Sequence, residues 1–213
     1  MFLLSVFLAA TAAIGYEIIA AATLVNLLGS SVFYFSLTIG VYLAALGLGA
    51  WLSARIRNEP AELLRSLVYI ESGVAVLGGS LSTLYYWLYA SAIESIRVGH
   101  FESFAALLSR IANGEVVFNF FAFGLLFLVG VLVGFELPLF SRFLASAQKL
   151  GSALGRVFFW DYLGALAASV ALPVFLFPSW GIIRTSFFLG FLNTLAAMVL
   201  LWLFYRRSHP VPF

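Results

Sequence analysis

The chain has 213 residues, of which 63% are hydrophobic and only 9% charged, and its formal net charge is +2. Soluble domains carry roughly a quarter charged residues, so this composition excludes an ordinary soluble domain and predicts an all-α, polytopic membrane protein. There is no cysteine, which excludes disulfides and thiolate chemistry. The two histidines, His100 and His209, lie far apart in the sequence, so we expect no metal centre and no cofactor.

Apolar runs divide the chain into candidate membrane crossings of about 20 residues each. The first run lacks the basic start of a signal peptide and is too long for a cleaved one, so it is expected to remain as a span. "GSS" at 29–31 predicts a tight turn, and Pro178 with Gly181 is expected to end the fifth helix. We predict one domain, 1–213, with six helices near 3–27, 32–54, 66–92, 116–140, 157–178 and 183–205.

Lysines and arginines between the apolar runs set the expected orientation. Arg97, Arg110 and Arg184 fall on one side, and the other eight of the eleven basic residues fall on the opposite side. The positive-inside rule then predicts that both termini lie in the cytoplasm. We expect the protein in the cytoplasmic membrane of a bacterium or archaeon. Because these residues act as topology signals, no nucleic-acid partner is expected. The eight are Arg55, Arg57, Arg65, Arg142, Lys149, Arg156, Arg206 and Arg207.

The long loop at 93–115 mixes apolar residues at roughly helical spacing with charged ones. This pattern is typical of an amphipathic helix lying in the outer membrane interface; a lid over an outward-facing cavity is the functional alternative. In the second helix, small residues at Gly40, Ala44, Ala45, Gly47 and Gly49 predict a close approach of another helix.

Four acidic residues lie inside apolar sequence, in "IGYEII", "VYIESGV", "VGFELPL" and "FWDYLGAL". An acidic residue at the bilayer centre costs roughly 2.5–3.5 kcal/mol, so four cost on the order of 10 kcal/mol. Three of them are expected at one level near the cytoplasmic face, and the first lies deeper. They are Glu17, Glu71, Glu136 and Asp161.

Two prolines and two arginines bear on how these acids are used. Pro138 and Pro173 each leave one helix carbonyl without its donor, which makes that carbonyl available to a water or a ligand. Arg142 and Arg156 flank the fourth and fifth helices, so the acids could form ion pairs with them. The alternatives are a structural polar layer of ion pairs or protonated acids, and a cavity that binds a cation or a polyamine.

The two halves of the chain share a short pattern. "GYEI" at 15–18 and "GFEL" at 134–137 are each followed by a Gly-Ser turn and a helix rich in small residues. Three helices in each half would make the two repeats inverted in the membrane.

The order of these features resembles a known family. "GYEI", "GSSVFYFSLTIGVYLAALGLGAWL", "ESG", "GFELPLFSR" and "DYLGALAASVALP" are together similar to the membrane-spanning region of the membrane-bound spermidine synthase-like proteins, the polyamine aminopropyltransferase family. The resemblance covers about residues 10–205 and includes the four acids. It implies a membrane region that is commonly joined to a soluble methyltransferase-like domain, which transfers an aminopropyl group from decarboxylated S-adenosylmethionine to putrescine.

Three functions remain open at this stage. Because the chain carries no glycine-rich nucleotide loop, we expect no enzymatic activity of its own and favour a non-catalytic membrane subunit or scaffold that packs against other membrane proteins. The first alternative is a module that binds or transports a polyamine or another cation through its carboxylates. The second is a membrane anchor for a separate catalytic chain.

Overall fold

The computed structural model describes residues 1–29, 31–97 and 104–208, and all secondary structure in this part of the chain is helical. The prediction of an all-α protein is confirmed. The helices are α1 (Phe2–Leu28), α2 (Ser31–Ser53), α3 (Pro60–Arg97), α4 (Phe104–Ala145), α5 (Leu150–Ala171), the π-helical turn η1 (Leu172–Leu176) and α6 (Phe177–Ser208).

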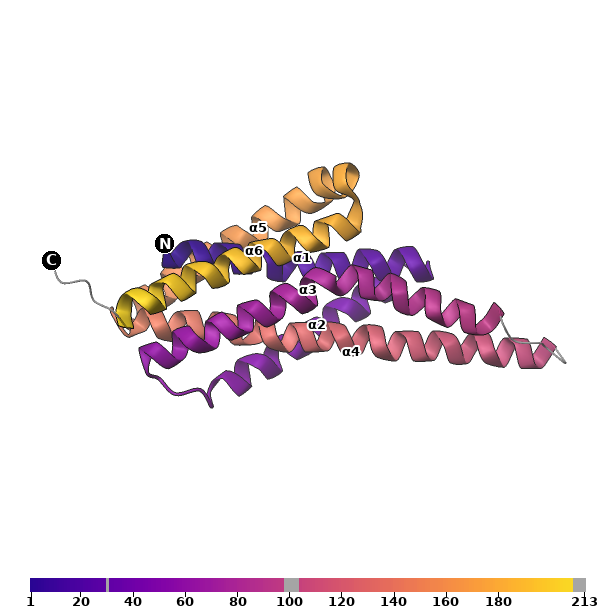
Figure 1. Ribbon diagram of the computed structural model, residues 1–213, viewed down its shortest axis with the longest axis horizontal. Coiled ribbons are helices and arrows are strands. Elements are labelled where there is room, and N and C mark those ends of the chain that lie inside the picture. The colour runs from indigo at the N-terminus through magenta and orange to yellow at the C-terminus, as the bar shows by residue number, and fades with distance from the viewer. Residues whose placement is uncertain (30, 98–103, 209–213) are drawn as a thin grey trace.

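Five segments of the described chain are long and apolar enough to cross a membrane. Four of them correspond to α1 to α4, and the fifth is a stretch of 57 residues, Leu150–Arg206, that contains α5, η1 and α6. Within it the backbone of Gly181 is non-helical, with φ 75° and ψ 169°, and Figure 1 shows that α5 and α6 run in opposite directions. The sixth separate crossing stays a prediction.

Helix α1 lies at the centre of the bundle, because it contacts all five of the other α-helices. It can do so because much of its surface is alanine and glycine, which let neighbouring backbones approach closely. Ala12, Ala20 and Leu24 are fully buried there, together with the ring of Tyr16.

The crossing of α2 and α4 is tighter still and depends on two glycines. A Cβ on Gly49 would lie 2.1 Å from the carbonyl oxygen of Val131, and a Cβ on Gly134 would lie 2.4 Å from that of Leu46. The predicted close approach on the second helix is therefore confirmed at Gly49. By contrast, a Cβ on Gly47 would meet nothing within 4 Å.

Short connections join the helices as the sequence suggests. Gly29 closes α1 in the left-handed conformation, with φ 80°, and its N–H donates to the carbonyl of Val25. At the α2–α3 connection, the guanidinium of Arg142 donates to the carbonyls of Ser53 and Ile56 and to Oδ1 of Asn58. One arginine of α4 thus fixes the end of α2.

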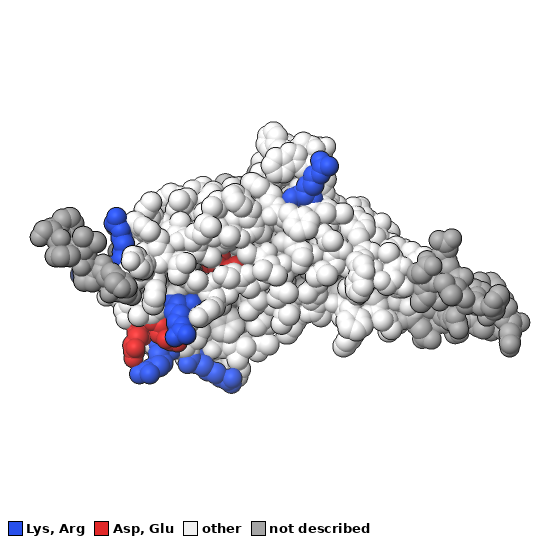
Figure 2. All heavy atoms as spheres, viewed as in Figure 1, with Lys and Arg blue, Asp and Glu red and all other residues white. Residues whose placement is uncertain are grey.

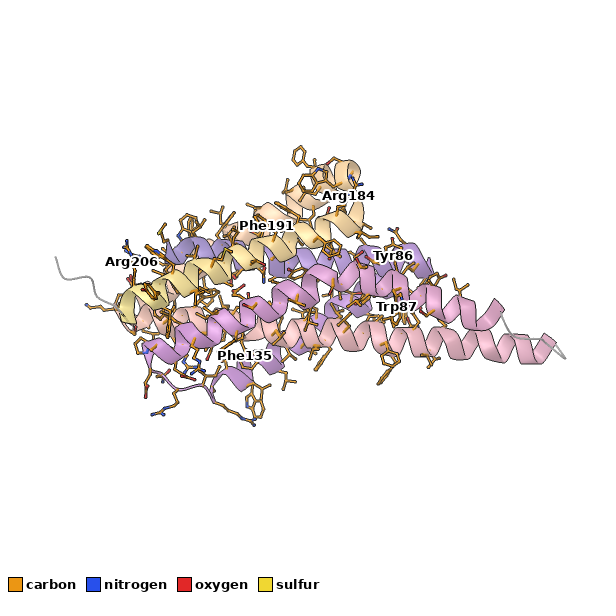
Figure 3. All side chains as sticks on the ribbon, viewed as in Figure 1. Tyr86, Trp87, Phe135, Arg184, Phe191 and Arg206 are labelled. Atoms are coloured by element: carbon orange, nitrogen blue, oxygen red, sulfur yellow. The ribbon has the colours of Figure 1, made fainter. Side chains whose placement is uncertain are left out.

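Described basic side chains gather at one end of the bundle, where α1, α3 and α5 begin and α2, α4 and α6 end (Figures 1 and 2). We call this the basic end. Figure 3 labels Arg206 there and Arg184 near the opposite end of α6. Three arginines at the basic end, Arg55, Arg65 and Arg206, each lie over an aromatic ring four residues away in the sequence.

The predicted interfacial helix at 93–115 is not confirmed as a separate element. Helix α3 continues to Arg97, α4 begins at Phe104, and residues 98–103 lie outside the described chain. The helices on either side of the loop are therefore longer than a minimal membrane crossing requires.

Candidate functional site

Two carboxyl groups lie buried inside the bundle and have oxygens without hydrogen-bond partners among the described residues. Glu71 of α3 is 0% exposed and Glu136 of α4 is 5% exposed. Both oxygens of Glu71 and Oε1 of Glu136 find no donor among the described residues. The two side chains lie close enough to interact electrostatically. Buried acids without partners are costly, so these two are candidates for binding a ligand.

A tyrosine from α1 lies beside this pair. Tyr16 is 0% exposed, and its hydroxyl, which lies near both Glu71 and Glu136, also lacks a partner in the described structure. Its ring packs on Gly78 of α3, where an added Cβ would lie 2.5 Å from the ring. A larger residue at 78 would displace the ring, so Gly78 places the Tyr16 hydroxyl beside the acids.

A cavity of about 290 Å³ adjoins Glu136. It lies between α1, α2, α4 and α5, and its walls are mostly apolar, with two carboxyl groups, Glu136 and Asp161, and two tyrosines, Tyr42 and Tyr162, as the side chains that carry polar groups. Tyr42 is buried, and its hydroxyl donates a 2.7 Å hydrogen bond to the carbonyl of Ala13. The lining residues are Ala10, Ala13, Ile14, Tyr42, Leu46, Ala50, Val133, Gly134, Glu136, Leu137, Pro138, Asp161, Tyr162 and Ala165.

Three of the four predicted acids come together around this cavity. Asp161 of α5 is partly buried, lines the cavity and interacts electrostatically with Glu136. Glu71 approaches Glu136 from α3. Glu17 of α1 is also partly buried but does not line the cavity; it interacts electrostatically with Tyr42. The role of these residues, in binding or in structure, stays a prediction.

The predicted prolines and arginines lie in different surroundings. Pro138 is inside α4 and lines the cavity, whereas Pro173 is exposed in η1, outside it. Arg156 is exposed on α5. Because the hydrogen bonds of Arg142 go to the α2–α3 connection, a role for either arginine as the acids' ion-pair partner stays a prediction.

Reasoning from the sequence missed the tyrosines of the site. Tyr16 and Tyr42 resemble the many other aromatic residues of the chain, and nothing in their local pattern marks a buried hydroxyl. Tyr16 directly precedes Glu17 in "GYEI", and this position beside a membrane-embedded acid is the one feature of the sequence that could have indicated its place in the site. No group of three or more His, Cys, Asp or Glu residues able to hold a metal lies within the described residues.

The arrangement can bind a slender cationic ligand. Ligand pockets usually measure about 300–1,000 Å³ and are lined mainly by apolar groups with a few polar ones, so the volume of this cavity, about 290 Å³, lies just below that range. Two carboxyl groups on separate helices can accept hydrogen bonds from ammonium groups, while the alanine and leucine walls suit methylene groups. A linear aliphatic amine combines both features.

Comparison with known proteins finds similar sequences in bacteria. The chain is 36% identical over 205 residues to polyamine aminopropyltransferases 2 and 1 of Ralstonia nicotianae, which covers 96% of the chain and 36% and 34% of those proteins. It is 31% identical over 208 residues to the polyamine aminopropyltransferase of Leptospira interrogans, covering 98% of the chain and 36% of that protein. The chain therefore spans about a third of the length of these relatives. No family model and no solved structure matches it.

These relatives correct one prediction. The sequence led us to expect that the chain has no enzymatic activity of its own, because no nucleotide-binding loop was found. That expectation is wrong, since nearly the whole chain matches proteins that are named as enzymes. The similarity to polyamine aminopropyltransferases, which the sequence motifs suggested, is supported.

Proposed function

We propose that this chain is the membrane-embedded part of a polyamine aminopropyltransferase, and that its cavity binds an aliphatic amine that is a substrate or product of the enzyme. The observation that carries the proposal is Glu136, a buried carboxyl group with an unpartnered oxygen, on the wall of a cavity that it shares with Asp161. The names of the relatives support a polyamine as the ligand.

In this proposal the chain crosses the membrane six times, with α5 and α6 as separate crossings. The basic end faces the cytoplasm, which places both termini there, in the cytoplasmic membrane of a bacterium. Two observations support this orientation. Basic residues collect at that end, and Arg55 over Trp51 and Arg206 over Trp202 are the aromatic and cationic pairs expected at a membrane interface.

The amine site explains why buried acids are present at all. An ammonium group placed between Glu136 and Asp161 would supply the donors that the described structure lacks, and Glu71 would add a further carboxyl group behind Glu136. In this role the chain is expected to supply the amine to the enzyme or to receive it from the enzyme.

Calorimetric titration of the purified intact chain with spermidine tests this proposal. Loss of one hydrogen bond to a charged group costs about 1.5–3 kcal/mol, so Glu136→Gln and Asp161→Asn should each weaken binding by roughly 10- to 100-fold. Glu59→Gln is the matched control, because Glu59 is exposed at the same end and pairs with Arg57. Equal affinities for all four proteins would remove the amine site and leave the acids a structural role.

A further inference from the structure

Positions 119 residues apart relate α1 and α2 in the first half of the chain to α4 and α5 in the second half, and positions 111 residues apart relate α3 to α6. The offset of 119 pairs Glu17 of "GYEI" with Glu136 of "GFEL", and it also pairs Tyr42 of α2 with Asp161 of α5. Helix contacts repeat in the same way: α2 packs on α4 as α5 packs on α1, and α3 packs on α4 as α6 packs on α1.

Close approaches between helices obey the same offset. A Cβ on Gly164 of α5 would lie 3.1 Å from the backbone nitrogen of Thr11, and a Cβ on Gly130 of α4 would lie 2.7 Å from the Cβ of Ala45. Thr11 and Gly130 are 119 positions apart, and so are Ala45 and Gly164. The α1–α5 and α4–α2 crossings are therefore equivalent contacts in the two halves.

Helices α3 and α6 cross at two equivalent residues, Gly79 and Gly190, which face each other. A Cβ on Gly79 would lie 3.1 Å from the Cα of Gly190, and a Cβ on Gly190 would lie 3.0 Å from the Cα of Gly79. Gly79 also faces the carbonyl of Ser186, and Gly190 faces the carbonyl of Ala75. Ala75 and Ser186 are 111 positions apart, and so are the two glycines. A contact between equivalent residues of the two halves lies on the two-fold axis that relates them.

The two halves are inverted relative to each other. In Figure 1, α1 and α4 run in opposite directions, as do α2 and α5, and α3 and α6. A two-fold axis across the helices produces this arrangement. Inverted repeats of this kind are the architecture of many secondary transporters, whose substrate sites lie at the interface between the repeats.

The cavity lies on this axis. Six of its lining residues form three pairs, each separated by the same 119 positions, and one pair contains a polar residue from each half. The pairs are Ile14 with Val133, Tyr42 with Asp161, and Leu46 with Ala165. Because both halves contribute equivalent residues, the cavity lies at the interface between the repeats.

The cavity nevertheless extends from the axis toward one end only. Ala10 and Glu136 line it on the side of the basic end, whereas their counterparts in the other half, Val129 and Glu17, do not line it. Val129 is fully buried. Two equivalent halves therefore adopt unequal arrangements around a shared site, and exchanging these arrangements would extend the cavity toward the opposite end.

We propose that the chain is an alternating-access carrier, in which the two halves rock about the α3–α6 crossing and expose the cavity to each face of the membrane in turn. The identity of the cargo, an aliphatic amine, rests on the proposed function. The arrangement described here is the state that faces the basic end. In the opposite state, Val129 and Glu17 line the cavity, and Ala10 and Glu136 are closed off.

Cysteine accessibility tests the two states directly, because the chain has no cysteine of its own. Ala10→Cys and Val129→Cys place thiols at equivalent positions of the two halves, and Ala196→Cys places one in the buried surface of α6, away from the cavity. A membrane-impermeant thiol reagent is added to sealed vesicles of either orientation. We expect the Ala10→Cys protein to be labelled only from the cytoplasmic side, the Val129→Cys protein only from the opposite side, and the Ala196→Cys protein from neither.

If the Val129→Cys protein is labelled from neither side of the membrane, the carrier proposal is wrong. Should Val129→Cys fail to yield a monodisperse protein, Ile18→Cys takes its place, because Ile18 is the counterpart of the lining residue Leu137, and the same outcomes decide. The second measurement is the uptake of labelled spermidine, added outside, into proteoliposomes that contain the protein. We expect uptake by the unmodified protein and no uptake by the Glu136→Gln protein. If spermidine binds but neither the expected one-sided labelling nor uptake is seen, the carrier proposal is wrong and the amine site stands. If the one-sided labelling is seen but spermidine does not bind, only the amine as cargo is wrong.

Discussion

The substitution Gly49→Ala should destabilise the bundle far more than Gly47→Ala, two residues away on the same helix. The added Cβ at 49 would lie 2.1 Å from the carbonyl oxygen of Val131 and 2.9 Å from the Cα of Gly134. Carbon–oxygen contacts between helices are ordinarily about 3.3–3.6 Å. Because both groups met by the new methyl are backbone, α2 and α4 would have to separate by about 1 Å to accommodate it.

Overpacking of this kind costs about 1–3 kcal/mol. Gly47→Ala meets nothing within 4 Å and should gain about 0.5–1 kcal/mol, because alanine restricts the unfolded chain more than glycine does. Because this gain applies equally to Gly49→Ala, the two variants should differ by the overpacking cost, roughly 1–3 kcal/mol. At about 2–4 °C per kcal/mol for a chain of this length, their melting temperatures should differ by about 2–12 °C.

Thermal unfolding of the two purified variants in one detergent, followed by intrinsic fluorescence and size-exclusion chromatography, measures this difference. Gly49→Ala should also weaken spermidine binding, because α2 and α4 carry Tyr42 and Glu136 on facing walls of the cavity. Equal melting temperatures for the two variants would refute the close α2–α4 crossing, and with it the geometry assigned to the cavity.

Three other changes have definite expected outcomes. Tyr85→Phe removes a buried hydrogen bond to the carbonyl of Ala122 and should lower stability by about 0.5–1.5 kcal/mol, the net value of one hydrogen bond, because that carbonyl lies inside α4 and keeps its helical donor; thermal melts check this. Gly29→Ala should cost about 1 kcal/mol through its left-handed backbone alone, whereas Gly29→Asn should be tolerated better. Arg142→Gln should leave the fold intact but loosen the end of α2 near Ser53, which faster hydrogen exchange of residues 53–59 would reveal.

The helices themselves follow from the sequence because composition decides them. A chain with 63% hydrophobic residues contains apolar runs long enough to cross a membrane. Glycines between these runs, such as Gly29 and Gly181, indicate where the chain turns. Observed helix ends extend beyond those predicted, most clearly where α4 begins at Phe104. The helical spacing in that stretch predicted a separate amphipathic helix in the membrane interface, and the sequence pattern did not reveal that the helix would be continuous with α4.

Which faces of the helices meet is much harder to predict. Lipid and protein interior are both apolar, so hydrophobic periodicity does not distinguish a lipid-facing side from a buried one. Gly47 and Gly49 look alike in the sequence, yet only Gly49 lies at a crossing. The meeting of Glu71 with Glu136 also depends on packing, since α3 and α4 could each have turned their acids elsewhere. Their polar character suggested convergence, but only three-dimensional packing specifies the neighbours.

The repeated motif explains why acids alone were an incomplete guide to the site. Glu17 and Glu136 occupy equivalent positions, but Glu136 has Asp161 and Glu71 nearby, whereas the counterparts of those residues are Tyr42 and an aliphatic side chain, Ile182. In the proposed cycle, an amine held by several carboxyl groups on the side of the basic end would meet only Glu17 and Tyr42 after the halves exchange arrangements. A cation held by fewer carboxyl groups is bound less tightly, so this asymmetry between the halves would favour loading at the basic end and release at the opposite end.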